Sequence, residues 1–275
     1  MPYIASPSEH DPSILYAVWK GRFDKESVRE FADSECNALR LSSPLYTKVV
    51  NLDAVSQLRE LRGFDYFGVG TNRRQDFSFL CNVDQLEEFG TDKEVSDRSE
   101  ISRWRGLKRY FGKWPGRSVS LADWPKIEHL NISSIKSVHD FAARVSNTLK
   151  VLQVFHSPAW NNPDLTICPN LVRFECHYCS SLNQLDTVSQ LRSLELFSLS
   201  KCKDLNHIPA FGPAMKRVVI EDCGKIQSFS DEPKHCPKEL IVIGCDLSDR
   251  AIEQIRVMQH SLTQLVLPPK YRERL

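Results

Sequence analysis

Apolar residues recur at fixed intervals through the second half of the chain. They occupy the first, fourth and sixth positions of a nine-residue block, which Cys or another uncharged residue closes. The blocks begin at Ile127, Leu149, Leu171, Leu194, Met215 and Pro237, and a shorter copy begins at Leu262. Successive starts lie 22, 22, 23, 21, 22 and 25 residues apart. The alternation of apolar and polar positions predicts a half-buried strand in each block, and the nearly constant period predicts a solenoid of stacked repeats.

The blocks are similar to those of the leucine-rich repeat family. They fit the pattern L-x-x-L-x-L-x-x-C/N with apolar residues at the L positions, as in LVRFECHYC from Leu171 and LELFSLSKC from Leu194. The resemblance covers residues 121–267. It implies an α/β solenoid, a leucine-rich repeat horseshoe with a parallel concave sheet and mixed helical and extended returns on the convex side. It implies little about function, because one fold can serve many functions.

The segments between the blocks predict two kinds of return. Residues 137–147 and 246–259 have apolar residues at helical spacing, and Ser248 is placed to cap the second helix. The apolar face of that helix is predicted to consist of Ala251, Ile252, Ile255 and Met258. Residues 207–215 contain two prolines and are expected to return in extended form. The run GCDLSDRAIEQI resembles the cysteine-containing subclass of the family, whereas other repeats are nearer in texture to those of plant resistance proteins.

The first half of the chain carries weaker copies of the pattern. LDAVSQLREL from Leu52 matches LDTVSQLRSL from Leu185 at eight of ten positions, which predicts a strand near residues 64–69. Looser copies begin at Ile14 and Cys36. We therefore expect one continuous solenoid domain with three regions. These are an N-terminal cap with degenerate repeats over 1–60, irregular repeats with a charged insertion (91–105) over 61–120, and regular repeats with the C-terminal end over 121–275.

The cysteine spacing Cys176-x-x-Cys179, with His177 between the two thiols, is compatible with a metal site, a redox pair or a structural role. The repeat pattern favours the structural role. Cys179, Cys202, Cys223 and Cys245 all hold the ninth position of their blocks, which in the leucine-rich repeat family points inward and meets loop backbone groups. Cys176 holds the sixth position, where other copies have Ile, Val or Leu, so it is expected to be a small core residue. No metal and no cofactor are expected.

The composition narrows the classes of partner and compartment. The chain has 275 residues, 41% of them hydrophobic, and its 36 Lys and Arg nearly balance its 35 Asp and Glu. A general phosphate-backbone binder usually has a basic excess, so nucleic acid is not the expected partner. The N-terminus lacks the pattern of a secretion signal, no apolar run is long enough to span a membrane, and nine cysteines suit a reducing compartment. A cytoplasmic protein is expected.

One basic segment allows two interpretations. SRWRGLKRYFGKWPGR, residues 102–117, interleaves basic and aromatic residues, and such a segment could contact nucleic acid or an acidic partner. It is also compatible with a degenerate repeat whose rings are buried and whose basic ends remain in water, and this second interpretation is favoured.

The outward positions of the predicted strands supply the candidate binding residues. Strand alternation places block positions 3, 5 and 7 on the concave face and position 8 at its edge. The densest group of aromatic and basic side chains falls on the blocks that begin at Leu149 and Leu171. The candidate partner-binding residues are His129, Gln153, Phe155, His156, Arg173, Glu175, His177, Tyr178, Lys201, Arg217, Glu221 and Glu239.

No sequence motif indicates an enzyme. The phosphate-binding loop, the dinucleotide-binding glycine pattern, the H-E-x-x-H zinc motif and the G-x-S-x-G elbow are all missing from the sequence. The expected function is therefore that of a non-enzymatic protein-binding repeat protein, and specifically a stoichiometric inhibitor or an immunity protein that neutralises a cognate toxin. Two alternatives remain. One is an adaptor whose N-terminal region docks on a larger assembly, and the other is an enzyme that uses an incidental Cys-His site.

Overall fold

The computed structural model describes residues 2–42, 47–50, 52–69, 73–116, 119–137, 141, 145–230 and 235–274. The chain divides into two compact units, Met1–Ile127 and Glu128–Leu275, which we name the N-terminal unit and the C-terminal unit. The three regions expected within one continuous domain stay a prediction.

The C-terminal unit is built on seven strands, one for each sequence block. Their order in the sheet is their order in the chain: β11 (His129–Ser133), β12 (Val151–Phe155), β13 (Arg173–His177), β14 (Leu196–Ser200), β16 (Arg217–Glu221), β19 (Glu239–Ile243) and β21 (Gln264–Val266). The strand starts lie 22, 22, 23, 21, 22 and 25 residues apart, as the block starts do. Each strand pairs in parallel with the next and keeps equal block positions opposite one another. The expected α/β solenoid of leucine-rich repeat type is thus confirmed.

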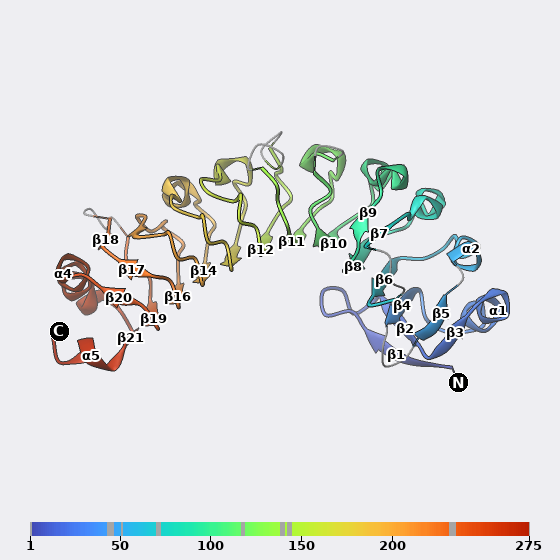
Figure 1. The fold of residues 1–275 in the computed structure, drawn as a ribbon, viewed down its shortest axis with the longest axis horizontal. Coiled ribbons are helices and arrows are strands. Elements are labelled where there is room, and N and C mark those ends of the chain that lie inside the picture. The colour runs from blue at the N-terminus through green and yellow to red at the C-terminus, as the bar shows by residue number, and fades with distance from the viewer. Residues whose placement is uncertain are drawn as a thin grey trace. The chain divides into compact units, whose positions relative to one another are not determined.

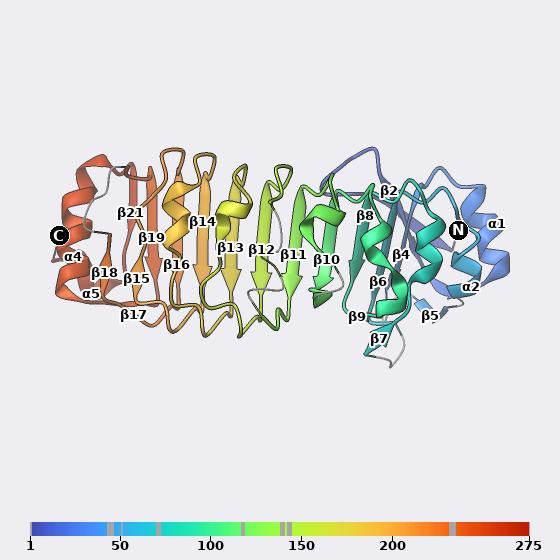
Figure 2. The same cartoon turned by 90° about the horizontal axis from the view of Figure 1, so that it is seen from above.

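The returns of the C-terminal unit lie behind the sheet and combine helical and extended segments, as the sequence predicts (Figures 1 and 2). They are η6 (Leu165–Ile167), η7 (Asp186–Gln190), β15 (His207–Ile208), β17 (Lys225–Ile226), β18 (Ser228–Phe229), β20 (Asp246–Leu247), α4 (Asp249–Met258), η8 (Gln259–Ser261) and α5 (Pro269–Arg272). The predicted extended return at 207–215 contains β15, which pairs in parallel with β18.

The second predicted helix is confirmed as α4. Its N-cap is Ser248, whose hydroxyl accepts a hydrogen bond from the backbone N–H of Ala251 at 3.1 Å. The four apolar residues expected on its inner face are all buried. Most of the helix expected over 137–147 lies outside the described residues.

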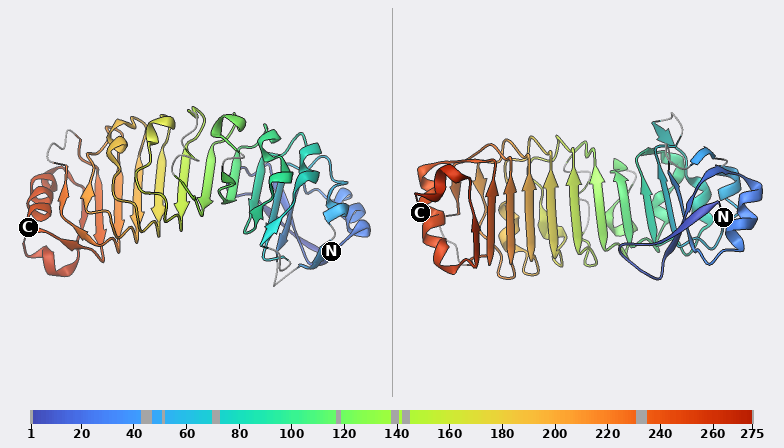
Figure 3. Two further views of the ribbon diagram at one scale, coloured as in Figure 1. Left: turned by 45° about the horizontal axis from the view of Figure 1, so that its top comes forward. Right: turned by 90° about the horizontal axis from the view of Figure 1, so that it is seen from below.

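The N-terminal unit also has a sheet, with one antiparallel strand at its beginning. β1 (Tyr3–Pro7) pairs antiparallel with β2 (Leu15–Trp19). Parallel pairing then continues through β4 (Ala38–Ser42), β6 (Gly63–Phe67), β8 (Glu88–Thr91) and β10 (Arg109–Lys113). β6 confirms the strand predicted near residues 64–69. Figure 3 shows the segment between β1 and β2 beside the strands of this sheet.

The remaining elements of the N-terminal unit form its returns. They are β3 (Gly21–Phe23), α1 (Lys25–Ala32), β5 (Thr47–Val50), α2 (Leu52–Val55), β7 (Arg74–Gln75), η1 (Ser78–Asn82), β9 (Glu94–Val95), η2 (Asp97–Ser99), η3 (Ile101–Arg103) and η5 (Leu121–Asp123). No helix in the described part of the chain combines the length and apolar character needed to cross a membrane.

The charged segment 91–105 is a repeat return and not an insertion. It contains β9, η2 and η3, and the strands on either side of it, β8 and β10, start 21 residues apart. That spacing equals an ordinary repeat. The charges that suggested an insertion lie on the outer side of a return whose apolar residues Val95, Ile101 and Trp104 are buried.

Three of the four aromatic residues of the basic segment 102–117 belong to the core, and Phe111 is partly exposed. Trp104, Tyr110 and Trp114 are all buried. The Trp104 ring packs on Phe89 with 4.7 Å between centroids, and Tyr110 stacks on Trp124 at 5.0 Å. The interpretation as a degenerate repeat is confirmed, because these rings are not exposed for stacking on bases.

The repeated cysteines occupy the inward positions that the repeat pattern assigns to them. Cys179, Cys202, Cys223 and Cys245 are buried, and each thiol lies 3.4–3.6 Å from the carbonyl oxygen two residues before it. Cys176 is also buried in the core. Among the described residues, no group of three or more His, Cys, Asp or Glu is arranged to hold a metal ion.

Candidate functional site

The outer face of the C-terminal sheet follows the predicted alternation. On β13, Phe174 and Cys176 are fully buried, while Arg173 is exposed and His177 is half-buried. The same alternation on β12 places Phe155 outward. Because neighbouring strands are in register, Phe155 lies opposite His177.

The eighth position of each block has an unusual backbone conformation. The left-handed φ angles are +58° at Ser134, +44° at His156, +57° at Tyr178, +56° at Lys201, +49° at Asp222 and +65° at Gly244. The N–H of four of them donates to the carbonyl oxygen at the end of the next strand, at 2.9–3.0 Å: His156, Tyr178, Lys201 and Asp222. Residues other than glycine adopt this conformation at a cost of about 1–2 kcal/mol. The turn therefore holds five side chains at the rim of the sheet. Glycine would adopt the same backbone conformation with less strain.

Five side chains from three consecutive repeats form one aromatic cluster. Phe155 stacks on His177 with 4.8 Å between ring centroids and 9° between planes. His156 stacks on Tyr178 at 4.6 Å and 21°. The Nζ of Lys201 lies 4.8 Å from the centre of the Tyr178 ring and donates to its hydroxyl at 3.1 Å. We call Phe155, His156, His177, Tyr178 and Lys201 the aromatic cluster.

A hydrogen-bonded row fixes the base of the aromatic cluster. The amide of Asn131 donates to Gln153 at 3.0 Å, and the amide of Gln153 donates to Glu175 at 2.9 Å. Arg173 donates to the other oxygen of Glu175, and a ring nitrogen of His177 lies 3.2 Å from the carboxylate.

This row changes the acidity and the role of Glu175. Burial alone would raise the pKa of Glu175, but hydrogen bonds from His177, Gln153 and Arg173 outweigh burial and lower this pKa to about 2. Only 8% of the residue is exposed. Glu175 therefore orients Arg173 and His177, whereas the sequence suggested that it projects toward a partner.

The other candidate residues lie on either side of the aromatic cluster along the sheet. His129 is half-buried on β11. On the opposite side, Arg217 and Glu239 form an ion pair at 3.4 Å, and Glu221 accepts a hydrogen bond from the hydroxyl of Ser200 at 3.3 Å. The twelve predicted residues thus lie on one face of the C-terminal sheet or at its rim, and their role in binding stays a prediction.

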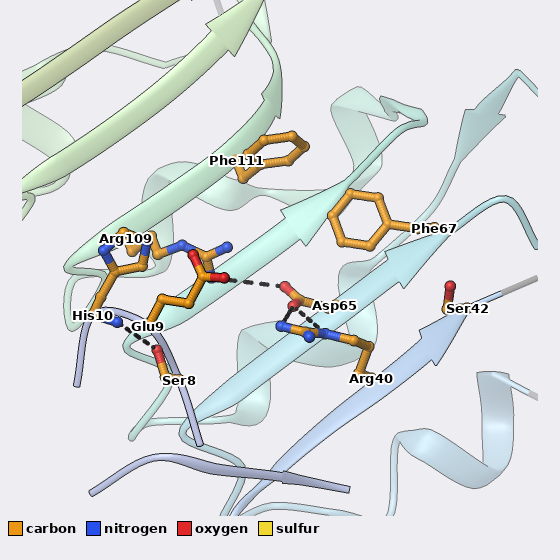
Figure 4. A pocket seen from close by; sticks show the side chains of 9 residues that line it. All are labelled: Ser8, Glu9, His10, Arg40, Ser42, Asp65, Phe67, Arg109 and Phe111. Carbon is orange, nitrogen blue, oxygen red and sulfur yellow. Dashed lines mark hydrogen bonds and ion pairs between the residues drawn. The ribbon is translucent and has the colours of Figure 1, made fainter. Parts of the chain in front are cut away.

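A second polar site, which was not predicted from the sequence, lies in the N-terminal unit. A hollow of about 350 Å³ there is lined by side chains of β4, β6 and β10 and by the segment after β1 (Figure 4). Its charged residues sit at outward strand positions, where solvated charges are common. Arg40 lies in the loose copy that begins at Cys36, and Asp65 lies on the strand predicted near residues 64–69. Only the fold brings Arg109 beside them and shows that Ser8–His10 cover them.

The comparisons with known proteins leave the family open. No protein-family model matches the sequence, and no curated protein matches it significantly. Among solved structures, an internalin (inlF) from Listeria monocytogenes str. 4b F2365 is similar, with a TM-score of 0.47 and 14% sequence identity over 93% of this chain and 87% of that chain. A similarity this low gives no information about the function of this chain.

Proposed function

We propose that this protein is a non-enzymatic binding protein that recognises another protein through the outer face of its C-terminal sheet. In this proposal it acts by occupying its partner stoichiometrically, as an inhibitor does, and an immunity protein that neutralises a cognate toxin is the specific form. The observation that carries the proposal is the aromatic cluster, with two stacked ring pairs and a lysine over one of the rings.

The composition of the aromatic cluster supports a protein partner. Aromatic side chains and Arg dominate the binding energy at the centres of protein interfaces. Tyr178 is 45% exposed although it is a large aromatic residue, and Arg173 is exposed at the other end of the same strand. The mixture of charges on the same face, with Glu221 and Glu239 near Arg217, suits a protein better than a phosphate backbone.

The conformation of the aromatic cluster also supports binding. Backbone strain persists where the surrounding structure or the function requires it, and here it displays His156, Tyr178 and Lys201 at the rim. The rings are already stacked and the hydrogen bonds of Glu175 hold Arg173 in place, so less side-chain entropy is lost when a partner binds.

The adaptor alternative would require an apolar docking surface near the N-terminus. In α1, Phe31 is buried and Val28 is only partly exposed, and no large hydrophobic residue of this helix is strongly exposed. The N-terminal helix thus supports the self-contained inhibitor over the adaptor. The nine free cysteines are consistent with the reducing cytoplasm that we propose as its location.

The test is quantitative capture of partners from lysate of the native cells. Tagged wild-type protein is compared with a variant that carries Phe155→Ala, Arg173→Glu and Tyr178→Gly, and with the control Val257→Ala. Val257 is 66% exposed on α4, behind the sheet. We expect one dominant protein at one-to-one stoichiometry with wild type and control, and its loss from the triple variant.

The inhibitor form has its own criterion. The captured partner should have an activity that is abolished by one equivalent of wild-type protein and restored when the triple variant replaces it. A dominant partner retained by a correctly folded triple variant would contradict the proposed surface. A bound partner whose activity is unchanged would contradict inhibition.

A further inference from the structure

The hollow in the N-terminal unit has three distinct sides. Arg40 and Asp65 line it from β4 and β6, Arg109 lines it from β10, and Ser8–His10 form a wall (Figure 4). Phe67 and Phe111 form the third side, and their rings meet edge to face with 5.5 Å between centroids. Polar and apolar surfaces therefore face the same space.

The wall is fixed by buried hydrogen bonds. The hydroxyl of Ser8 donates to Glu88 at 2.7 Å, and the hydroxyl of Tyr16 donates to the same carboxylate at 3.0 Å. Farther along the segment, the guanidinium of Arg62 donates to the hydroxyl of Ser13 at 2.9 Å. Since Glu88 is 2% exposed, the segment after β1 is a built part of the structure.

The buried carboxylates and guanidinium groups beside the hollow are paired, except at one oxygen atom. Arg40 pairs with Oδ2 of Asp65 at 2.8 Å, and Arg109 pairs with Glu88 at 3.2 Å. Oδ1 of Asp65, whose side chain is 1% exposed, accepts no hydrogen bond from any described residue, and its nearest ion-pair partner is Arg109 at 3.9 Å. Burying a carboxylate oxygen without a hydrogen-bond donor costs free energy, and a ligand that supplies a donor would recover it.

Gly90 is what permits this position of Asp65. The two residues lie opposite each other in the register of β6 and β8. A side-chain carbon at Gly90 would lie 2.4 Å from Oδ1 of Asp65 and 2.9 Å from the ring of Phe67. The missing side chain lets a carboxylate and a phenyl ring lie side by side at the edge of the hollow.

The balance of charges limits the class of ligand. A simple cation would meet the guanidinium groups of Arg40 and Arg109, and a simple anion would meet the carboxylates of Asp65 and Glu9, so either would be repelled at short range. A ligand that carries both charges satisfies both sets of groups. The two phenyl rings add a place for an apolar group.

We propose that this hollow binds a small zwitterion of the α-amino acid type with an apolar side chain. Its ammonium group donates to Oδ1 of Asp65, its carboxylate accepts from the guanidinium of Arg109, and its side chain packs on Phe67 and Phe111. This site is independent of the protein-binding face proposed for the C-terminal unit.

Calorimetric titration of the full chain tests this site with matched probes. L-Phenylalanine and L-leucine are compared with 2-phenylethylamine, which lacks the carboxylate, and with 3-phenylpropionate, which lacks the ammonium group. We expect at least one amino acid to bind with a Kd on the order of 1 mM or tighter, and each truncated probe to bind at least about tenfold more weakly. Failure of both amino acids to bind, or equal binding of either truncated probe, would overturn the proposal.

Variants then locate the bound amino acid. Asp65→Asn and Phe67→Ala should each weaken binding at least about tenfold, and Tyr178→Gly in the C-terminal unit should leave it unchanged. Phe67 is partly exposed, so its variant provides a second test if Asp65→Asn does not fold. Unchanged affinity in a folded Phe67→Ala variant would refute the site, whatever the outcome for the protein-binding face.

Discussion

Tyr178 has a backbone conformation that glycine adopts at little cost, and its ring nevertheless projects from the rim of the sheet. Its φ angle is +57°, and His156 and Lys201 have the same left-handed conformation on the adjacent repeats. The three side chains contact one another in a row, ring on ring and cation on ring. The same residues thus carry both the backbone strain and the exposed side chains. A substitution by glycine can therefore remove a binding side chain while it relieves the strain.

Tyr178→Gly is expected to remove the ring with little loss of stability. The relief of left-handed strain, about 1–2 kcal/mol, opposes the entropy cost of glycine, about 0.5–1 kcal/mol, and the loss of stacking, about 0.5–1.5 kcal/mol. The free energy of unfolding, measured by urea titration, should therefore lie within about 1.5 kcal/mol of wild type. Tyr178→Ala keeps the strain and should be less stable than Tyr178→Gly; the reverse order would contradict the strained conformation.

Glu175 predicts a specific dependence of stability on pH. Its pKa of about 2 in the folded protein is lower than the value of about 4.3 expected for an unfolded Glu. A carboxylate with a lowered folded pKa stabilises the protein above the unfolded pKa, and that contribution is lost as the pH falls toward the folded pKa. The stability advantage of wild type over Glu175→Gln should therefore shrink between about pH 4.5 and pH 2. A difference in unfolding free energy that stays constant over this range would show that the hydrogen bonds to Glu175 do not form.

The strands show how far a periodic sequence determines its elements. Each strand of the C-terminal unit begins at the third position of its block and includes apolar positions 4 and 6, which face the core. The helix α4 was predictable from its cap and its apolar face. The return at 91–105 was not, because its charges concealed the buried residues Val95 and Trp104.

The N-terminal hollow could not be predicted at the level of elements. The burial of Glu88 depends on Ser8, which is 80 residues away in the chain. Nothing local in EEFGT distinguishes this glutamate from a solvated one, because burial comes from a contact between distant segments. The aromatic cluster was easier to predict, since the period alone places Phe155 opposite His177 and His156 beside Tyr178.

The ninth-position cysteines predict a pattern of thiol labelling. Seven of the nine free cysteines are buried, and only Cys81 and Cys236 are partly exposed. Burial raises the pKa of both of these thiols, and it raises the pKa of Cys168 to about 12. Because the thiolate is the reactive form, we expect slow labelling of at most two sites in the native protein and of all nine after unfolding, as counted by mass spectrometry. Rapid native labelling of Cys176 or Cys179 would instead favour a chemical role for that pair.

The whole chain carries two candidate sites of different chemistry, one in each unit. The C-terminal unit offers stacked rings and mixed charges on an open sheet face, while the N-terminal unit offers a walled hollow with balanced buried charges. In a repeat protein each repeat contacts mainly its neighbours, so substitutions in the aromatic cluster should leave the N-terminal hollow unaffected. The balance of 36 basic and 35 acidic residues fits selective contacts better than long-range attraction to a charged polymer.

The most direct measurement of the central claim is the affinity of the captured partner for two purified proteins. One is wild type, and the other carries Phe155→Ala with Tyr178→Gly, after its unfolding curve has been shown to match wild type. If the aromatic cluster is the centre of the interface, loss of two aromatic anchors at about 2 kcal/mol each raises the Kd by a factor on the order of several hundred. A Kd within about threefold of wild type, well under 1 kcal/mol, would show that the partner binds elsewhere and would contradict the proposed function of this face.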